Sequence, residues 1–125
     1  MISILLLLLQ QPDKQFDLHC IGWERTTFQN TDHSERKVIR NLKIDLINGD
    51  WCEEDCKVKM RIASNNGYYF QLREERREAG WHKTDYFYID KMYYQSFFEE
   101  PRDGGILVHR AEMKCEKAAY SGIPG

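Results

Sequence analysis

The chain has 125 residues, and its 18 basic and 20 acidic side chains leave a formal net charge of −2. This length fits one domain. Because basic and acidic residues are interspersed, the chain offers no basic field for a nucleic acid, and we expect no nucleic-acid partner. No internal repeat, proline-rich linker or low-complexity segment divides it.

The N-terminus carries a short apolar run over residues 2–9, broken only by Ser3. The run is far shorter than the ~20 residues that span a bilayer, but it fits the apolar region of a secretory signal. No basic residue precedes it and no small-residue cleavage motif follows, and a buried strand or helix of a cytosolic protein is the alternative. We expect 1–11 to be a signal peptide or leader, and 12–125 to form a single β domain that is periplasmic or secreted.

The hydrophobic pattern in the first part of the domain predicts antiparallel strands. Residues 16–20 alternate between apolar and polar side chains, which predicts a half-buried strand that Gly22 ends or bulges. A polar loop over 30–34 follows. A second alternating segment over 38–46 ends at the asparagine-glycine turn at 48–49.

The middle of the chain continues the same pattern. Alternation over 57–62 and over 68–72 predicts two strands, which the turn at 65–67 separates. Residues 73–80 are charged and have no apolar stripe that could dock a helix on a core. We therefore expect an exposed hairpin loop there, with a short helix as the alternative.

Three further segments complete the predicted fold. Residues 83–90, 92–98 and 106–115 predict strands, and 100–105 predicts a loop rich in turn-forming residues. The total is about seven to eight strands. We expect an all-β fold, a single antiparallel meander that forms a small barrel or sandwich and is closed or nearly closed.

Four cysteines allow three disulfide pairings. A Cys20–Cys115 bridge would join the first and last strands, which are neighbours in a closed barrel, and would stabilise the fold by ~4.7 kcal/mol on the loop-length formula. A Cys52–Cys56 bridge would close a local loop and contribute ~2 kcal/mol on the same formula. We expect both bridges, and hence an oxidising compartment.

A zinc site is the competing interpretation of the cysteines. Structural zinc is usually held by two short cysteine pairs. This chain has one such pair and two isolated cysteines, and His19 is expected on the strand face opposite Cys20. We therefore expect no metal and no cofactor.

No residue pattern in the chain is typical of catalysis. The histidines fall in no zinc-protease motif, no G-x-S-x-G elbow is present, and the carboxylates occur in runs on predicted loops. We expect a protein that is not an enzyme, with no catalytic residue.

Aromatic residues concentrate between Tyr68 and Phe98. Alternation places some on each face of the sheet, and the structural interpretation is a core on one face and cross-strand pairs on the other. The functional interpretation is a surface for a ligand or a protein partner. The candidate ligand-binding residues are Trp81, Tyr86, Tyr88 and Tyr94.

Four segments of the chain form an ordered set of motifs. They are Phe16-Asp17-Leu18-His19-Cys20-Ile21-Gly22, Lys43-Ile44-Asp45-Leu46, Trp51-Cys52-Glu53-Glu54-Asp55-Cys56, and Cys115 with Ser121-Gly122-Ile123-Pro124. The set resembles a group of small exported bacterial proteins of unknown function, whose members carry F-x-L-x-C-x-G, I-D-L-x4-W-C-x3-C and a C-terminal cysteine before S-G-F-P. Here Lys114 stands where the group tends to have glycine, and Ile123 replaces the usual phenylalanine. The resemblance implies export and two disulfides, and it implies no activity.

Three classes of function fit these observations. We expect a monomeric binding module for a small ligand or an envelope protein, with no stable membrane span. The alternatives are a proteinaceous inhibitor of an envelope or wall-acting enzyme, and a structural accessory protein of the envelope. A protruding loop over 99–105 would favour the inhibitor, and a filled interior with no concave face would favour the accessory protein.

Overall fold

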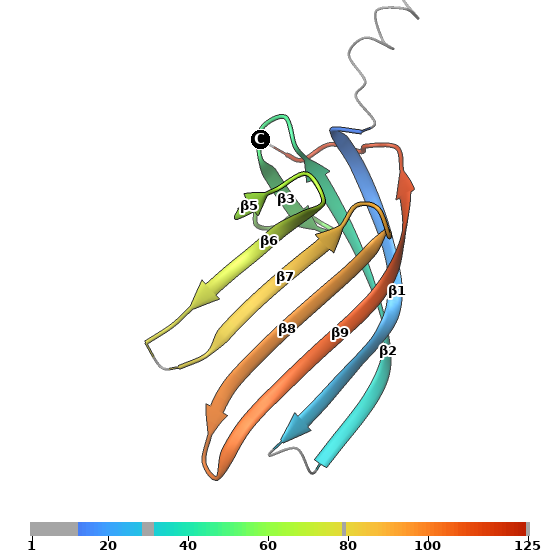
Figure 1. Ribbon diagram of the computed structural model, residues 1–125. Helices are drawn as coiled ribbons and strands as arrows, with labels where there is room; N and C mark the ends of the chain where they lie inside the picture. Colours follow the sequence, from blue (N-terminus) through green and yellow to red (C-terminus); the bar gives the residue numbers. More distant parts are fainter. Residues whose placement is uncertain (1–12, 29–31, 79, 125) are drawn as a thin grey trace, which may run out of the picture.

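The computed structural model describes residues 13–28, 32–78 and 80–124, so the predicted leader over 1–11 lies outside the described residues. Within those ranges the chain forms nine strands, and all neighbouring strands are antiparallel (Figure 1). The predicted all-β fold is confirmed. The strands are β1 (Gln15–Phe28), β2 (Asp32–Asp45), β3 (Asp50–Glu53), β4 (Met60–Arg61), β5 (Ser64–Asn65), β6 (Tyr69–Arg76), β7 (His82–Tyr88), β8 (Tyr93–Arg102) and β9 (Gly105–Ala118).

The strands make one sheet in the order β4-β3-β2-β1-β9-β8-β7-β6-β5. The first and last long strands, β1 and β9, are therefore neighbours in the middle of the sheet. The sheet curls, so that β3 and β5 lie at the same end of the molecule (Figure 1). Trp51 Nε1 of β3 donates a hydrogen bond of 2.8 Å to the carbonyl oxygen of Leu72 in β6. The result is a half-barrel, whose two walls are in contact at this end.

The core lies inside the curled end of the sheet. Its side chains come from inward-facing positions of seven strands, β1, β2, β3, β6, β7, β8 and β9, as the alternation predicts. Trp51, Phe87 and Tyr94 are fully buried there. The core consists of Phe16, Leu18, Cys20, Leu42, Ile44, Trp51, Phe70, Leu72, Phe87, Tyr94, Ala111, Met113 and Cys115.

Both expected disulfides are present. Cys20 of β1 lies directly opposite Cys115 of β9, with 4.0 Å between the Cα atoms, and the two form a bridge. Cys52 and Cys56 form the second bridge, across the loop that follows β3. The predicted turns at Gly49 and Gly67 are also confirmed, since these residues have φ angles of 75° and 90°.

The prediction that Gly22 ends or bulges the first strand is wrong. β1 continues through Gly22 to Phe28 and pairs with β2 and β9 beyond it. A Cβ atom at Gly22 would lie 1.8 Å from the carbonyl oxygen of Glu112 and 2.6 Å from the Cα atom of Met113. Glycine is therefore needed here because two backbones approach closely.

We expect Gly22→Ala to lower the free energy of unfolding by about 1–3 kcal/mol, because β1 must move away from β9 to admit the methyl group. Urea unfolding, followed by tryptophan fluorescence, measures the loss. The control is Ile21→Ala, since Ile21 is partly exposed on the other face and its loss should cost less than about 1 kcal/mol. Equal losses in the two variants would contradict the close-approach argument.

Several predicted boundaries are wrong because the hairpins run beyond the core. Residues 32–34 of the predicted loop over 30–34 belong to β2, and β6 runs on to Arg76 inside the predicted loop over 73–80. The predicted loop over 100–105 reduces to a turn at 103–104. Conversely, only Met60–Arg61 of the predicted strand over 57–62 is a strand.

The strand extensions were missed because neither face of these segments packs into the apolar core. There the strands are held by cross-strand ion pairs such as Arg25–Glu35 and Arg36–Glu24. Such segments show no apolar alternation, so the period-two signal does not mark them.

Candidate functional site

The outer face of β6, β7 and β8, turned away from the core, carries a tyrosine cluster formed by Tyr69, Tyr86, Tyr88 and Tyr93. The ring centroid of Tyr69 lies 5.7 Å from that of Tyr86 and 5.5 Å from that of Tyr88. Tyr86 and Tyr88 are stacked at 6.4 Å, and Tyr88 lies 6.1 Å from Tyr93. All four side chains are half-buried, so the rings hold one another in place while part of each faces solvent.

Strand register explains why these four residues meet. Phe70 and Phe87 point into the core, which turns Tyr69, Tyr86 and Tyr88 outward. In the register of β7 and β8, Tyr88 lies directly opposite Tyr93, so these two side chains are on the same face of the sheet.

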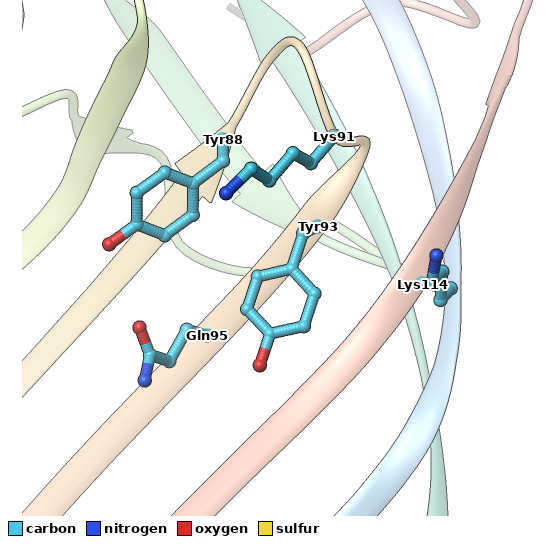
Figure 2. A pocket seen from close by; sticks show the side chains of 5 residues that line it. All are labelled: Tyr88, Lys91, Tyr93, Gln95 and Lys114. Carbon is cyan, nitrogen blue, oxygen red and sulfur yellow. The ribbon is translucent and has the colours of Figure 1, made fainter.

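An open groove lies on this face, over β7, β8 and β9 (Figure 2). Its volume is about 570 Å³, within the range of small-molecule sites. A neighbouring hollow of about 320 Å³ shares Gln95 with it and extends the surface toward Tyr86 and Arg110. We call the larger hollow the outer groove. It is lined by Tyr88, Lys91, Tyr93, Gln95 and Lys114.

The hydroxyls of Tyr86 and Tyr93 stay protonated at neutral pH. Burial and the negative charge of Glu112, which forms a hydrogen bond with the Tyr93 hydroxyl, together raise the pKa of Tyr93 to about 12. Burial and the charge of Glu74 likewise raise the pKa of Tyr86. Both phenols therefore remain neutral hydrogen-bond donors beside the groove.

The structure brings together two of the four aromatic residues that the sequence suggested. Tyr86 and Tyr88 belong to the tyrosine cluster. Trp81 lies just before β7 and packs against Phe98, with ring centroids 6.0 Å apart. Tyr94 is fully buried in the core, where its hydroxyl accepts a hydrogen bond of 3.1 Å from Arg40 Nη1.

Four residues of the outer groove were not among the predicted ligand-binding residues: Lys91, Tyr93, Gln95 and Lys114. A usable signal was the connection Ile89-Asp90-Lys91-Met92 between two strands. If those four residues form the hairpin loop, Tyr88 pairs with Tyr93, and Tyr93 rather than Tyr94 shares its face. The position of Lys114 depends on the pairing of β8 with β9, for which the sequence offers no comparable signal.

A buried charge pair lies on the opposite, inner face, beside the core. Asp85 is fully buried, and its Oδ2 atom lies 3.7 Å from Nε of Arg73. The guanidinium of Arg73 also lies over the ring of Trp51, at 5.3 Å. Neither Asp85 carboxylate oxygen has a hydrogen-bond partner, so its charge is compensated by Arg73 at 3.7 Å and by Arg40, which interacts with it from farther away.

Comparisons with known proteins add no guide to function: the chain matches no protein-family model, no curated protein and no solved structure. Within the part of the chain that the structure describes, no cluster of three or more His, Cys, Asp or Glu residues is placed to hold a metal ion. In the same residues no helix is long and apolar enough to cross a membrane. The functional argument therefore depends on the geometry of the outer groove.

Proposed function

We propose that the protein is a non-enzymatic binding module of the periplasm or the extracellular space, and that the outer groove binds a small ligand. The observation that carries the proposal is a groove of about 570 Å³ in which Tyr88 and Tyr93 are held against each other. The two disulfides are compatible with an oxidising compartment.

The chemistry of the groove supports binding. Tyrosine rings offer a large contact area and lose little conformational entropy on binding, because only two side-chain torsions are fixed. Contacts within the tyrosine cluster restrict Tyr88 further, since it lies between Tyr69, Tyr86 and Tyr93. A ligand therefore meets a surface that is largely pre-organised.

A protein partner from the envelope is the second candidate, and one observation favours it. Ile21, Trp23 and Ile39 are exposed on the outer face of β1 and β2, by 39%, 60% and 56% respectively. Exposed apolar side chains that gather on one face are typical of protein contact sites. The inhibitor alternative has no such support, because β8 and β9 pair as far as Arg102 and Gly105 and leave no protruding loop.

The proposal is tested by screening the oxidised protein against a set of small sugars, amino acids and aromatic acids, using two-dimensional amide NMR spectra. We expect ligands whose shift changes map to β7, β8 and β9. Tyr88→Ala should weaken their binding about tenfold, on the scale of one lost aromatic contact. Tyr68→Ala is the matched control, because Tyr68 is 75% exposed and lies outside the groove.

Two results would count against the small-ligand proposal. Equal weakening by Tyr88→Ala and Tyr68→Ala would show that the groove does not provide the contact. Shift changes confined to β1 and β2 would transfer the binding function to the surface around Trp23.

A further inference from the structure

The outer groove is positively charged because two lysines line it. Lys91 comes from the turn between β7 and β8, and Lys114 from β9. Lys114 lies opposite Tyr93 in the register of β8 and β9. In Figure 2 the Lys91 side chain lies above the ring of Tyr93 and points toward Tyr88, and Lys114 lies on the other side of Tyr93, over β9. The groove lining thus carries two cations and no carboxylate, on a chain whose formal net charge is −2.

Neither lysine forms an ion pair in the described part of the chain, because no carboxylate there lies within ion-pair distance of Lys91 or Lys114. The acid nearest to the groove along β9 is Glu112, which lies opposite Gln95, lines the neighbouring hollow together with Arg110 and is held by a hydrogen bond to the Tyr93 hydroxyl. Two unpaired ammonium groups on one groove add their potentials and favour a negatively charged ligand.

We propose that the outer groove selects a small ring compound that carries a carboxylate or a phosphate. The inference deepens the proposed function and depends on it. The ring packs against Tyr88 and Tyr93, and the combined positive potential of Lys91 and Lys114 attracts the anionic group. The side-chain amide of Gln95 both donates and accepts hydrogen bonds, so it can contact a hydroxyl group on the ring.

Sugar acids, sugar phosphates and aromatic acids share this chemistry, and matched pairs of probes separate them. Glucose is compared with glucuronate and with glucose 6-phosphate, and 4-hydroxybenzyl alcohol is compared with 4-hydroxybenzoate. Inorganic phosphate is the anion without a ring. Each probe is titrated into the full-length oxidised protein at low salt, and the shift changes of the amides of β7, β8 and β9 give the affinity.

We expect the anionic member of at least one pair to bind about five- to tenfold more tightly than its neutral partner. The preference should shrink at physiological salt, because the screening length falls from about 30 Å to about 8 Å. The double variant Lys91→Gln/Lys114→Gln should lose the preference and keep the weaker binding of the neutral compound. Lys59→Gln, which removes an exposed lysine outside the groove, should keep it.

The outcomes separate this inference from the proposed function. Equal affinity for neutral and anionic members, or a preference that survives in the double variant, overturns the inference and leaves a groove that binds neutral ligands. Phosphate that binds as tightly as the ring anions overturns the role of Tyr88 and Tyr93. If no probe and no compound of the wider screen shifts the groove amides, both the inference and the proposed function fail.

Discussion

Replacing Arg73 with methionine should lower the free energy of unfolding by about 3–5 kcal/mol, because the substitution removes the cation nearest to a buried carboxylate and leaves only the more distant Arg40. Asp85 is fully buried, and Arg73 is the residue that pairs with it, at 3.7 Å. Urea unfolding at neutral pH, followed by tryptophan fluorescence, measures the change. Arg76→Met is the matched control: the Arg76 side chain is 73% exposed on the same strand, and its loss should cost at most about 1 kcal/mol.

The two partners of this pair are not equivalent. Arg73 has further carboxylates within reach, at 4.0 Å from Glu53 and 3.9 Å from Glu75. We therefore expect Asp85→Ala to cost about 1–3 kcal/mol, less than Arg73→Met, because the remaining arginine keeps acidic neighbours. A larger loss for Asp85→Ala than for Arg73→Met would contradict this assignment of the charges.

A double variant distinguishes the lost ion pair from lost packing. Arg73→Met combined with Asp85→Val removes both charges and fills the space with apolar groups. Replacing a buried ion pair in this way is often neutral or stabilising. Recovery of most of the stability that Arg73→Met loses would confirm that the unpaired Asp85 carboxylate causes the loss.

Much of the core could be predicted from the sequence, because period-two alternation marks strands that have one buried face. Phe16, Leu18 and Cys20 point inward as their alternation indicates. Arg73 could not be predicted, because the register shifts between Gln71 and Arg73. At that bulge the alternation breaks, and a residue that a regular strand would turn outward lies beside Asp85.

The candidate site was harder to predict than the core. Tyr93 and Tyr94 are adjacent and chemically alike, so only the hairpin register decides which of them faces the core. The sequence analysis chose Tyr94, which the structure buries beside Arg40. Lys114 lines the groove because β9 pairs with β8. The amino-acid composition of a strand does not indicate which side chains of another strand will lie beside it.

Removing the Cys20–Cys115 bridge should have the second large effect on stability. In the double variant Cys20→Ala/Cys115→Ala we expect the free energy of unfolding to fall by about 4–5 kcal/mol on the loop-length formula. Alanine is chosen because Cys20 is fully buried, where a serine hydroxyl would add the cost of an unpaired polar group. Urea unfolding of the oxidised proteins measures the change.

The comparison with Cys52→Ala/Cys56→Ala tests the mechanism. The two bridges close loops with sequence separations of 95 and 4 residues. Because the entropy of the unfolded chain rises with the logarithm of loop length, the second variant should lose about 2–3 kcal/mol less than the first. The first variant should also unfold with a steeper dependence on urea, because its unfolded chain is free to expand.

The position of the long-range bridge explains why its loss should act mainly on the unfolded chain. β1 and β9 remain paired along Asp17–Phe28 and Leu107–Ala118 when the sulfur atoms are removed, so the folded sheet keeps its hydrogen bonds. Removal of the bridge changes the unfolded chain, whose two ends are then no longer linked and must come together during folding. Equal losses in the two cysteine variants would mean that local packing around the sulfurs, and not loop closure, determines their contribution.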